Sequence, residues 1–313
     1  MTDVAPAAPT PALSLSERRG RLIGIGLMCG ALLCFSLLDA TAKWLNRSVD
    51  PMLTVWARYL SSVVLVALFI NPWTHPGVLR TTRPWYQTAR SVLLFLSTAL
   101  NFWALQYLQL VKTISIIFAT PLLVALMAGP LLGEWVGGRR LVAIGVGFLG
   151  VLIVTRPGLG TMHPAALLSV AGAFAYALYA IMTRVLAASD SSHTTMVYSG
   201  FAGVALATPI VPFVWTTPDS TLAWIMLVLI GAFGAIGHWL LILAHARAPA
   251  AVLSPFIYSQ LLWMLALGYF VFGQWPDHWT LIGAGVVIVS GLYLLSREHA
   301  KPLQVRAPGS GRG

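Results

Sequence analysis

The residues of this chain that could bind another molecule are the few polar and ionisable side chains inside long apolar segments. Asp39 and Lys43 are four apart in one such segment, so a helix would place them on one face, where they can pair. Arg58 and Lys112 fall near the ends of two other apolar segments. With Lys43 they would form a cationic rim around one carboxylate, which suits an anionic or zwitterionic solute. A structural ion pair and snorkelling to lipid headgroups are the alternatives.

A second set of candidates combines aromatic rings with polar groups in the middle of apolar segments. Such rings can stack on a planar solute and hydrogen-bond its edge, and lipid contact or helix packing is the alternative for each one. These candidates are Phe35, Asn101, Trp103, Phe118, Tyr176, Tyr179, Trp239, Tyr258 and Gln260. His238 joins them, either as a neutral histidine bonded to a neighbouring helix or as a residue that binds solute or a proton.

The sequence offers no metal site and no catalytic group. His238 and His245 are seven apart on one helical face, but no third ligand lies near them. HExxH, P-loop and GxSxG patterns are absent, so an intramembrane enzyme is a remote alternative, and we expect no cofactor.

Several glycines in the apolar segments are interpreted as positions of close helix packing. Gly145–Gly150 matches the dinucleotide pattern GxGxxG, but that pattern needs an acidic residue about 20 positions further on, and none lies between Thr155 and Ala188. Gly26 and Gly231 are interpreted in the same way.

The composition requires lipid as the solvent for these segments. Of the 313 residues, 58% are hydrophobic and 9% are charged, whereas a soluble domain has about 25% charged residues. The net charge of +10 comes from basic residues between the apolar runs, where they orient the protein in a membrane. We therefore expect a lipid bilayer around the chain and no nucleic acid as a partner.

Apolar runs long enough to cross a bilayer predict an all-α polytopic membrane protein with ten transmembrane helices. The predicted spans are Leu22–Leu45, Leu53–Ile70, Ser91–Leu108, Val111–Leu132, Leu141–Thr155, Pro164–Ala187, Thr194–Trp215, Leu222–Ala246, Pro249–Phe272 and Trp279–Ser296. Pro121 and Pro255 lie inside the fourth and ninth, where they would break the helix beside a cavity. Residues 1–20 and 297–313 are predicted to be disordered tails.

The basic residues predict the orientation. With a cytoplasmic N-terminus, only Lys43, Arg47, Arg58, Lys112 and Arg156 of the 19 lysines and arginines would face the outside. Because cytoplasmic segments are enriched in basic residues, we expect a multi-pass inner-membrane protein with both termini in the cytoplasm.

The two halves of the chain resemble one another. A shift of 140 residues places Leu132–Trp135 over Phe272–Trp275, and a shift of 141 places Lys43 over Arg184. These matches predict two units, 21–157 and 158–296, with five spans each. Because five is odd, the second unit enters the membrane from the opposite side, which is the inverted repeat of transporters that work by alternating access.

The chain resembles the EamA-type drug/metabolite transporters over residues 22–296. The resemblance rests on SLLDATAKWL, WARYLSSVVL, RSVLLFLSTALNFWALQYLQLVKTISIIFATPLLVAL and LLGEW. It implies a central cavity lined by the first, third, fourth, sixth, eighth and ninth spans. Gln274 stands where the first half has Glu134, which argues against a symmetric role for that carboxylate.

The pattern of Asp39, Lys43, Arg58 and Arg90 is similar to the branch that takes up S-adenosylmethionine or riboflavin. We therefore expect a secondary transporter that moves a small polar, ring-bearing metabolite, such as riboflavin or S-adenosylmethionine, across the inner membrane. An exporter of amino acids or other metabolites is the alternative, because both share the fold. A homodimer is left open.

Overall fold

The structure is a computed structural model that describes residues 15–71, 73–133, 135, 137–157, 163–186 and 189–299, and these residues form helices and no strands. Glu134 and most of the two predicted tails lie outside the described residues. The helices are α1 (Leu15–Leu45), α2 (Pro51–Phe69), α3 (Pro84–Tyr107), α4 (Leu110–Ile117), α5 (Thr120–Leu132), α6 (Gly138–Thr155), α7 (Ala165–Leu186), α8 (Ser192–Ala207), η1 (Val211–Phe213), α9 (Thr221–Arg247), α10 (Ala250–Leu253), η2 (Ser254–Ser259), α11 (Gln260–Phe272) and α12 (His278–His299).

Nine helical stretches of the described chain are at least 18 residues long and apolar enough to cross a membrane. Each corresponds to one of the ten predicted spans. The seventh predicted span, Thr194–Trp215, contains α8, which has 16 residues. At about 1.5 Å per residue α8 is about 24 Å long, which is shorter than a hydrocarbon core of ~30 Å. The seventh predicted span therefore stays a prediction, and with it the total of ten.

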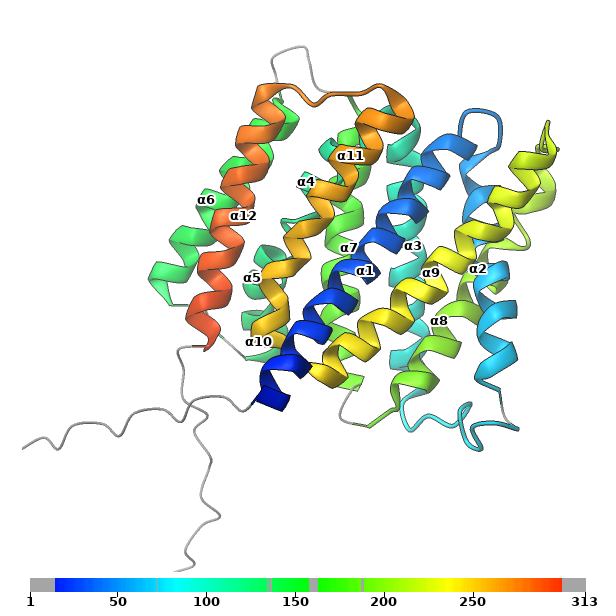
Figure 1. The fold of residues 1–313 in the computed structure, drawn as a ribbon, viewed down its shortest axis with the longest axis horizontal. Helices are drawn as coiled ribbons and strands as arrows, with labels where there is room; N and C mark the ends of the chain where they lie inside the picture. Colours follow the sequence, from blue (N-terminus) through cyan, green and yellow to red (C-terminus); the bar gives the residue numbers. More distant parts are fainter. Residues whose placement is uncertain are drawn as a thin grey trace, which may run out of the picture.

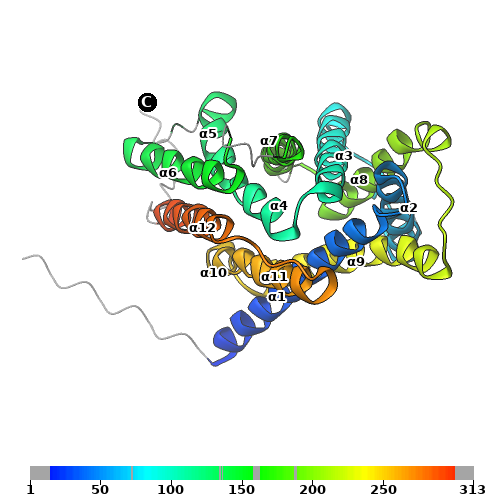
Figure 2. The same ribbon diagram turned by 90° about the horizontal axis from the view of Figure 1, so that it is seen from above.

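The long helices stand side by side in two rows (Figures 1 and 2). One row contains α5, α7, α3 and α8, and the other contains α11, α1 and α9. The rows meet at one end where α6 packs against α12, and at the other where α2 packs against both α8 and α9. Below, the "amino face" is the face where α1 begins and α2 ends, and the "opposite face" is the one where α1 ends (Figure 1).

Local signals decide where several helices begin. Asp50 caps α2 by accepting a hydrogen bond from the Met52 backbone N–H at 2.8 Å. Pro84 occupies the first position of α3, where a proline is favoured because its missing N–H would have no partner. Consequently α3 begins seven residues before the predicted Ser91. Likewise α1 begins at Leu15, and α12 ends at His299, so both extend into segments predicted as tails.

Helix breaks occur at both predicted prolines, but neither break contributes to the wall of the cavity described below. The helical stretch Leu110–Leu132 is interrupted between α4 and α5, next to Pro121. The second break is the 3-10 segment η2, which contains Pro255 and joins α10 to α11. Phe118 in the first break contacts Tyr258 in the second, with ring centroids 5.0 Å apart in an edge-to-face arrangement. The two breaks therefore meet inside the molecule.

Glycines bring some helices close enough for their backbones to touch. A Cβ atom on Gly150 of α6 would lie 2.9 Å from the backbone oxygen of Gly283 on α12, and a Cβ on Gly283 would lie 2.7 Å from the oxygen of Gly150. Gly231 of α9 packs against the Arg58 backbone of α2 in the same way. The interpretation was wrong for Gly26 and Gly145, where a Cβ would meet nothing within 4 Å.

Gly145 and Gly150 provide a matched pair of substitutions in α6. Gly150→Ala forces α6 away from α12, and overpacking of this kind typically costs about 1–3 kcal/mol. Gly145→Ala meets no neighbour and gains helix propensity of roughly 0.5–1 kcal/mol. We expect the apparent unfolding temperature in detergent to fall for Gly150→Ala and to stay or rise for Gly145→Ala. Equal unfolding temperatures would contradict the close approach of the two helices.

Candidate functional site

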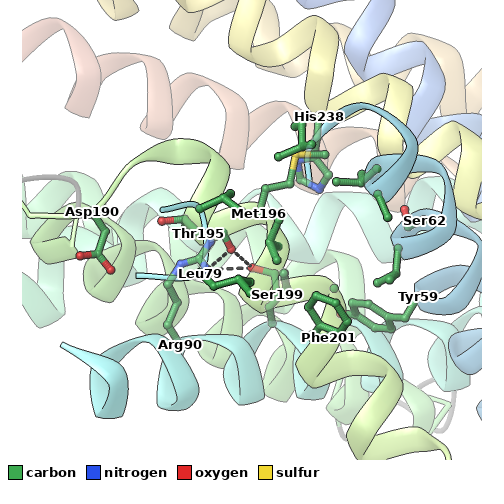
Figure 3. Close-up of a pocket in the computed structure, with 18 of the residues that line it drawn as sticks. Tyr59, Ser62, Leu79, Arg90, Asp190, Thr195, Met196, Ser199, Phe201 and His238 are labelled. Carbon is green, nitrogen blue, oxygen red and sulfur yellow. Dashed lines mark hydrogen bonds between the residues drawn. The ribbon is translucent and has the colours of Figure 1, made fainter. Parts of the chain in front are cut away.

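A cavity of about 340 Å³ lies between α2, α3, α7, α8 and α9 (Figure 3). Its walls include Arg58 and Tyr59 on α2, Arg90 on α3, Tyr179 on α7 and His238 on α9. It extends to Asn71, Leu79 and Asp190, which lie on the connecting segments at the amino face. A cavity of this size is within the range of pockets that hold drug-sized molecules.

Arg90 has the densest set of polar contacts in the cavity wall. Its guanidinium donates to Thr183 Oγ1 at 2.7 Å, to Ser199 Oγ at 2.8 Å, to the Tyr179 hydroxyl at 2.9 Å and to the Thr195 carbonyl at 3.2 Å. It also lies over the Tyr179 ring, 4.5 Å from the centroid. All these partners are neutral, so the positive charge of Arg90 stays uncompensated beside the cavity.

Arg58 provides a second cation deeper in the cavity. Its guanidinium lies 4.6 Å from the centroid of the Tyr59 ring, and its Nη1 is 3.5 Å from Thr98 Oγ1. The buried Nε of Arg58 has no hydrogen-bond partner. The described residues include an ion pair between Arg156 and Asp277, at 2.7 Å and remote from the cavity, and none that involves Arg58 or Arg90. Neither cavity arginine is therefore neutralised by a carboxylate in contact.

Asp190 supplies the negative charge at the edge of the cavity. Burial by itself raises the pKa of Asp190, but hydrogen bonds from Thr81 and Gln87 outweigh that effect and hold the pKa below its usual value. The carboxylate is therefore ionised at neutral pH. These bonds also tie the α7–α8 connection to the segment before α3 and to α3 itself.

The predicted pairing of Asp39 with Lys43 was wrong. Lys43 Nζ instead donates to the carbonyls of Leu105 and Leu108, at 2.9 and 2.6 Å, at the end of α3. Such carbonyls have no partner within the helix and attract cations, which explains the preference of Lys43 for them. Asp39 accepts a hydrogen bond of 3.0 Å from Asn101 Nδ2.

Of the twelve predicted site residues, Tyr179 and His238 line the cavity. Phe35 packs against His238 with ring centroids 5.0 Å apart. Phe118, Tyr258 and Gln260 lie at the helix breaks. Trp103, Tyr176 and Trp239 are 37%, 41% and 46% exposed and are not part of the cavity wall. Asp39, Lys43 and Asn101 lie outside the wall as well.

Sequence reasoning missed most of the polar wall. The prediction that the third span begins at Ser91 places Arg90 in the preceding cytoplasmic segment, whereas the structure places it inside α3. The proline at position 84 is the signal that would have placed Arg90 inside the helix. Thr183, Thr195 and Ser199 offered no such signal, because hydroxyl residues are common in membrane helices.

Comparison with known proteins identifies the family to which this chain belongs. Residues 22–156 and residues 163–297 each match the family model described as "EamA-like transporter family". A riboflavin transporter of Vibrio cholerae is 27% identical over 299 residues, which cover 93% of this chain and 99% of that protein. An S-adenosylmethionine uptake transporter of Rickettsia bellii is 26% identical over 276 residues, which cover 88% of this chain and 94% of that protein.

A solved crystal structure superposes with a TM-score of 0.62 and covers 91% of this chain and 99% of its own. At 18% sequence identity, this likeness shows the fold alone. The two stretches matched by the family model together span most of the sequence. This chain is therefore a multi-pass membrane protein that belongs to the EamA-like transporter family.

Proposed function

We propose that this chain is a secondary transporter that moves a small polar, ring-bearing metabolite across the inner membrane by alternating access. The cavity carries the proposal, because it combines cations and aromatic rings in a space of metabolite size that reaches one face of the molecule. A protein that only anchors something to the membrane has no need of such a cavity. The alternative of an exporter differs only in direction.

Two inverted units, 21–157 and 158–296, are the architecture that we propose for this movement. The contacts between helices occur in exchanged pairs that such a repeat would generate. Helix α1 packs against α9 as α7 packs against α3, and α2 packs against α9 as α8 packs against α3. Both α5 and α11 have 13 residues and end at a left-handed glycine, Gly133 and Gly273. In this scheme α8 belongs to the seventh span and completes the total of ten.

The charge of the cavity favours a flavin-like solute. Arg58 and Arg90 can donate to carbonyl oxygens and stack on flat rings, which suits the isoalloxazine group of riboflavin. Tyr179 and Tyr59 add ring faces and hydroxyl groups. The sulfonium group of S-adenosylmethionine would instead place a positive charge next to two arginines. We therefore prefer riboflavin to S-adenosylmethionine as the type of solute.

Filling the cavity should stop transport. Val66 lines the cavity, whereas Val64, two residues away on α2, is 54% exposed on the outer surface of the helix. In proteoliposomes we expect Val66→Trp to reduce exchange of radiolabelled riboflavin at least tenfold, because the larger ring occupies the space. Val64→Trp should leave exchange near the wild-type rate. Equal exchange by both variants, at equal amounts of reconstituted protein, would rule out this cavity as the pathway.

The preference for a flavin can be tested by ligand-dependent stability. A solute that binds the folded state raises the unfolding temperature in proportion to its concentration relative to Kd. We expect riboflavin to raise the apparent unfolding temperature of purified protein and S-adenosylmethionine to have a smaller effect. Arg90→Gln should abolish the riboflavin effect. Stabilisation by S-adenosylmethionine alone would reverse the assignment.

The orientation is a separate prediction. With both termini in the cytoplasm, the amino face and the mouth of the cavity face the cytoplasm. An alkaline phosphatase fusion after residue 299 should be inactive, whereas a fluorescent protein at the same position should fluoresce. An active phosphatase fusion would mean that the cavity opens to the outside.

A further inference from the structure

Asp39 is the one acidic residue of this chain that lies inside a membrane-crossing stretch. The sequence has nine acidic residues, and the other eight lie outside the nine long apolar stretches. A carboxylate at membrane depth is costly and persists where it binds an ion, a proton or a solute. The solute cavity does not account for it, because Asp39 is not part of the cavity wall.

The surroundings of Asp39 link it to the cavity through one residue. Asn101 on α3 donates to the carboxylate, and Arg58 on α2 is the cation that acts on it electrostatically. Arg58 also lines the cavity, so the cation that acts on the partly buried carboxylate borders the solute space as well. The distance between Arg58 and Asp39 exceeds that of an ion pair in the described structure.

The polar atoms around Asp39 can satisfy both protonation states. Asn101 donates through Nδ2 to the charged carboxylate, while its Oδ1 is buried without a partner. A protonated Asp39 has an O–H donor, and a rotated Asn101 amide would accept that hydrogen bond through Oδ1. A buried acceptor without a partner is unusual in a folded protein, and it is the group that a protonated acid needs.

Other ionisable groups close to Asp39 are few. His238 on α9 packs against Phe35, one turn before Asp39 on α1. Lys43 lies one turn after Asp39, but its ammonium group is held by the carbonyls at the end of α3. Arg58 is thus the charged group outside α1 that acts on Asp39 electrostatically.

We propose that Asp39 is a proton-binding site that couples the movement of one proton to the movement of the solute, with Arg58 as the link. When the solute engages Arg58, the carboxylate loses part of its electrostatic stabilisation and takes up a proton from the aqueous phase. The proton passes from a hydronium ion to the carboxylate, so one O–H bond breaks and one forms. The solute and the proton then leave together on the other side. This inference rests on the proposed transport function.

Infrared difference spectroscopy tests the proton site without any solute. On acidification, the purified wild-type protein should gain a carboxylic C=O band that is absent in Asp39→Asn and retained in Asp219→Asn, an exposed loop residue. An unchanged band in Asp39→Asn would overturn the proposal. If Asp39→Asn fails to reach the membrane, Asp39→Glu takes its place, and the band must then change frequency. A band that keeps its frequency would be equally decisive against Asp39.

Transport assays test the coupling. In proteoliposomes with a pH gradient of one unit, acidic outside, wild-type protein should accumulate riboflavin up to about tenfold. A tenfold difference in proton concentration is worth about 1.4 kcal/mol, and one proton moved per solute supports an equal, tenfold difference in solute concentration. Asp39→Asn mimics the protonated state, so the loaded carrier should still exchange riboflavin but should no longer accumulate it. Asp219→Asn should do both.

The results separate this inference from the proposed function. Riboflavin exchange by the wild type without accumulation in the pH gradient would remove the proton coupling and leave the transport function intact. Accumulation by Asp39→Asn at the wild-type level would remove Asp39 as the site. Absence of exchange in every protein would count against the proposed solute, while the infrared band would still decide whether Asp39 binds a proton.

Discussion

A guanidinium group within a membrane-crossing helix finds no hydrogen-bond partner in the hydrocarbon core, so its partners come from the protein or from water in a cavity. Arg90 satisfies this constraint with hydroxyl and carbonyl groups of α7 and α8, and it is only 3% exposed. The positions of α7 and α8 relative to α3 are therefore tied to this one side chain. Because its partners are neutral, the bonds hold the wall together without cancelling the charge that faces the cavity.

A related interaction joins α1 to α3 at the opposite face. The last carbonyls of α3 lack partners within the helix, and Lys43 near the end of α1 donates to Leu105 and to Leu108, which follows α3. Asn46, just after α1, adds a hydrogen bond of 2.7 Å to the Phe102 carbonyl. The end of α1 is thus fastened to the end of α3 at the face away from the cavity mouth. The asymmetry between a fastened face and a cavity at the other face is what one state of an alternating-access cycle requires.

The sequence predicted the elements of the fold better than the residues of the cavity. The apolar runs and the prolines at 121 and 255 act locally, so they revealed nine membrane-crossing stretches and both helix breaks. Tyr176 and Tyr179 show where this fails, because they lie three positions apart on one helix and their rings stack at 5.3 Å, yet only Tyr179 lines the cavity. Which side of a helix faces a cavity depends on its neighbours.

The same limit applies to polar pairs. Asp39 and Lys43 have the spacing of an ion pair on one helix, yet each found a stronger partner on α3, which is distant in sequence. A helix end with free carbonyls competes for a lysine, and an amide competes for a carboxylate. Neither competitor can be recognised until the position of α3 beside α1 is known. Local spacing therefore did not predict the partners of Asp39 and Lys43.

The arrangement of charges explains how one molecule could separate a solute from a proton. The cavity contains cations and a carboxylate at its edge and reaches the amino face, whereas Asp39 is not part of its wall and bonds to Asn101. If Asp39 faced the cavity, water would stabilise its charge and its protonation would respond little to the solute. In the proposed coupling, Arg58 borders the cavity and acts on Asp39, so the stabilisation of the carboxylate depends on what occupies the cavity. Coupling then needs a single shared side chain.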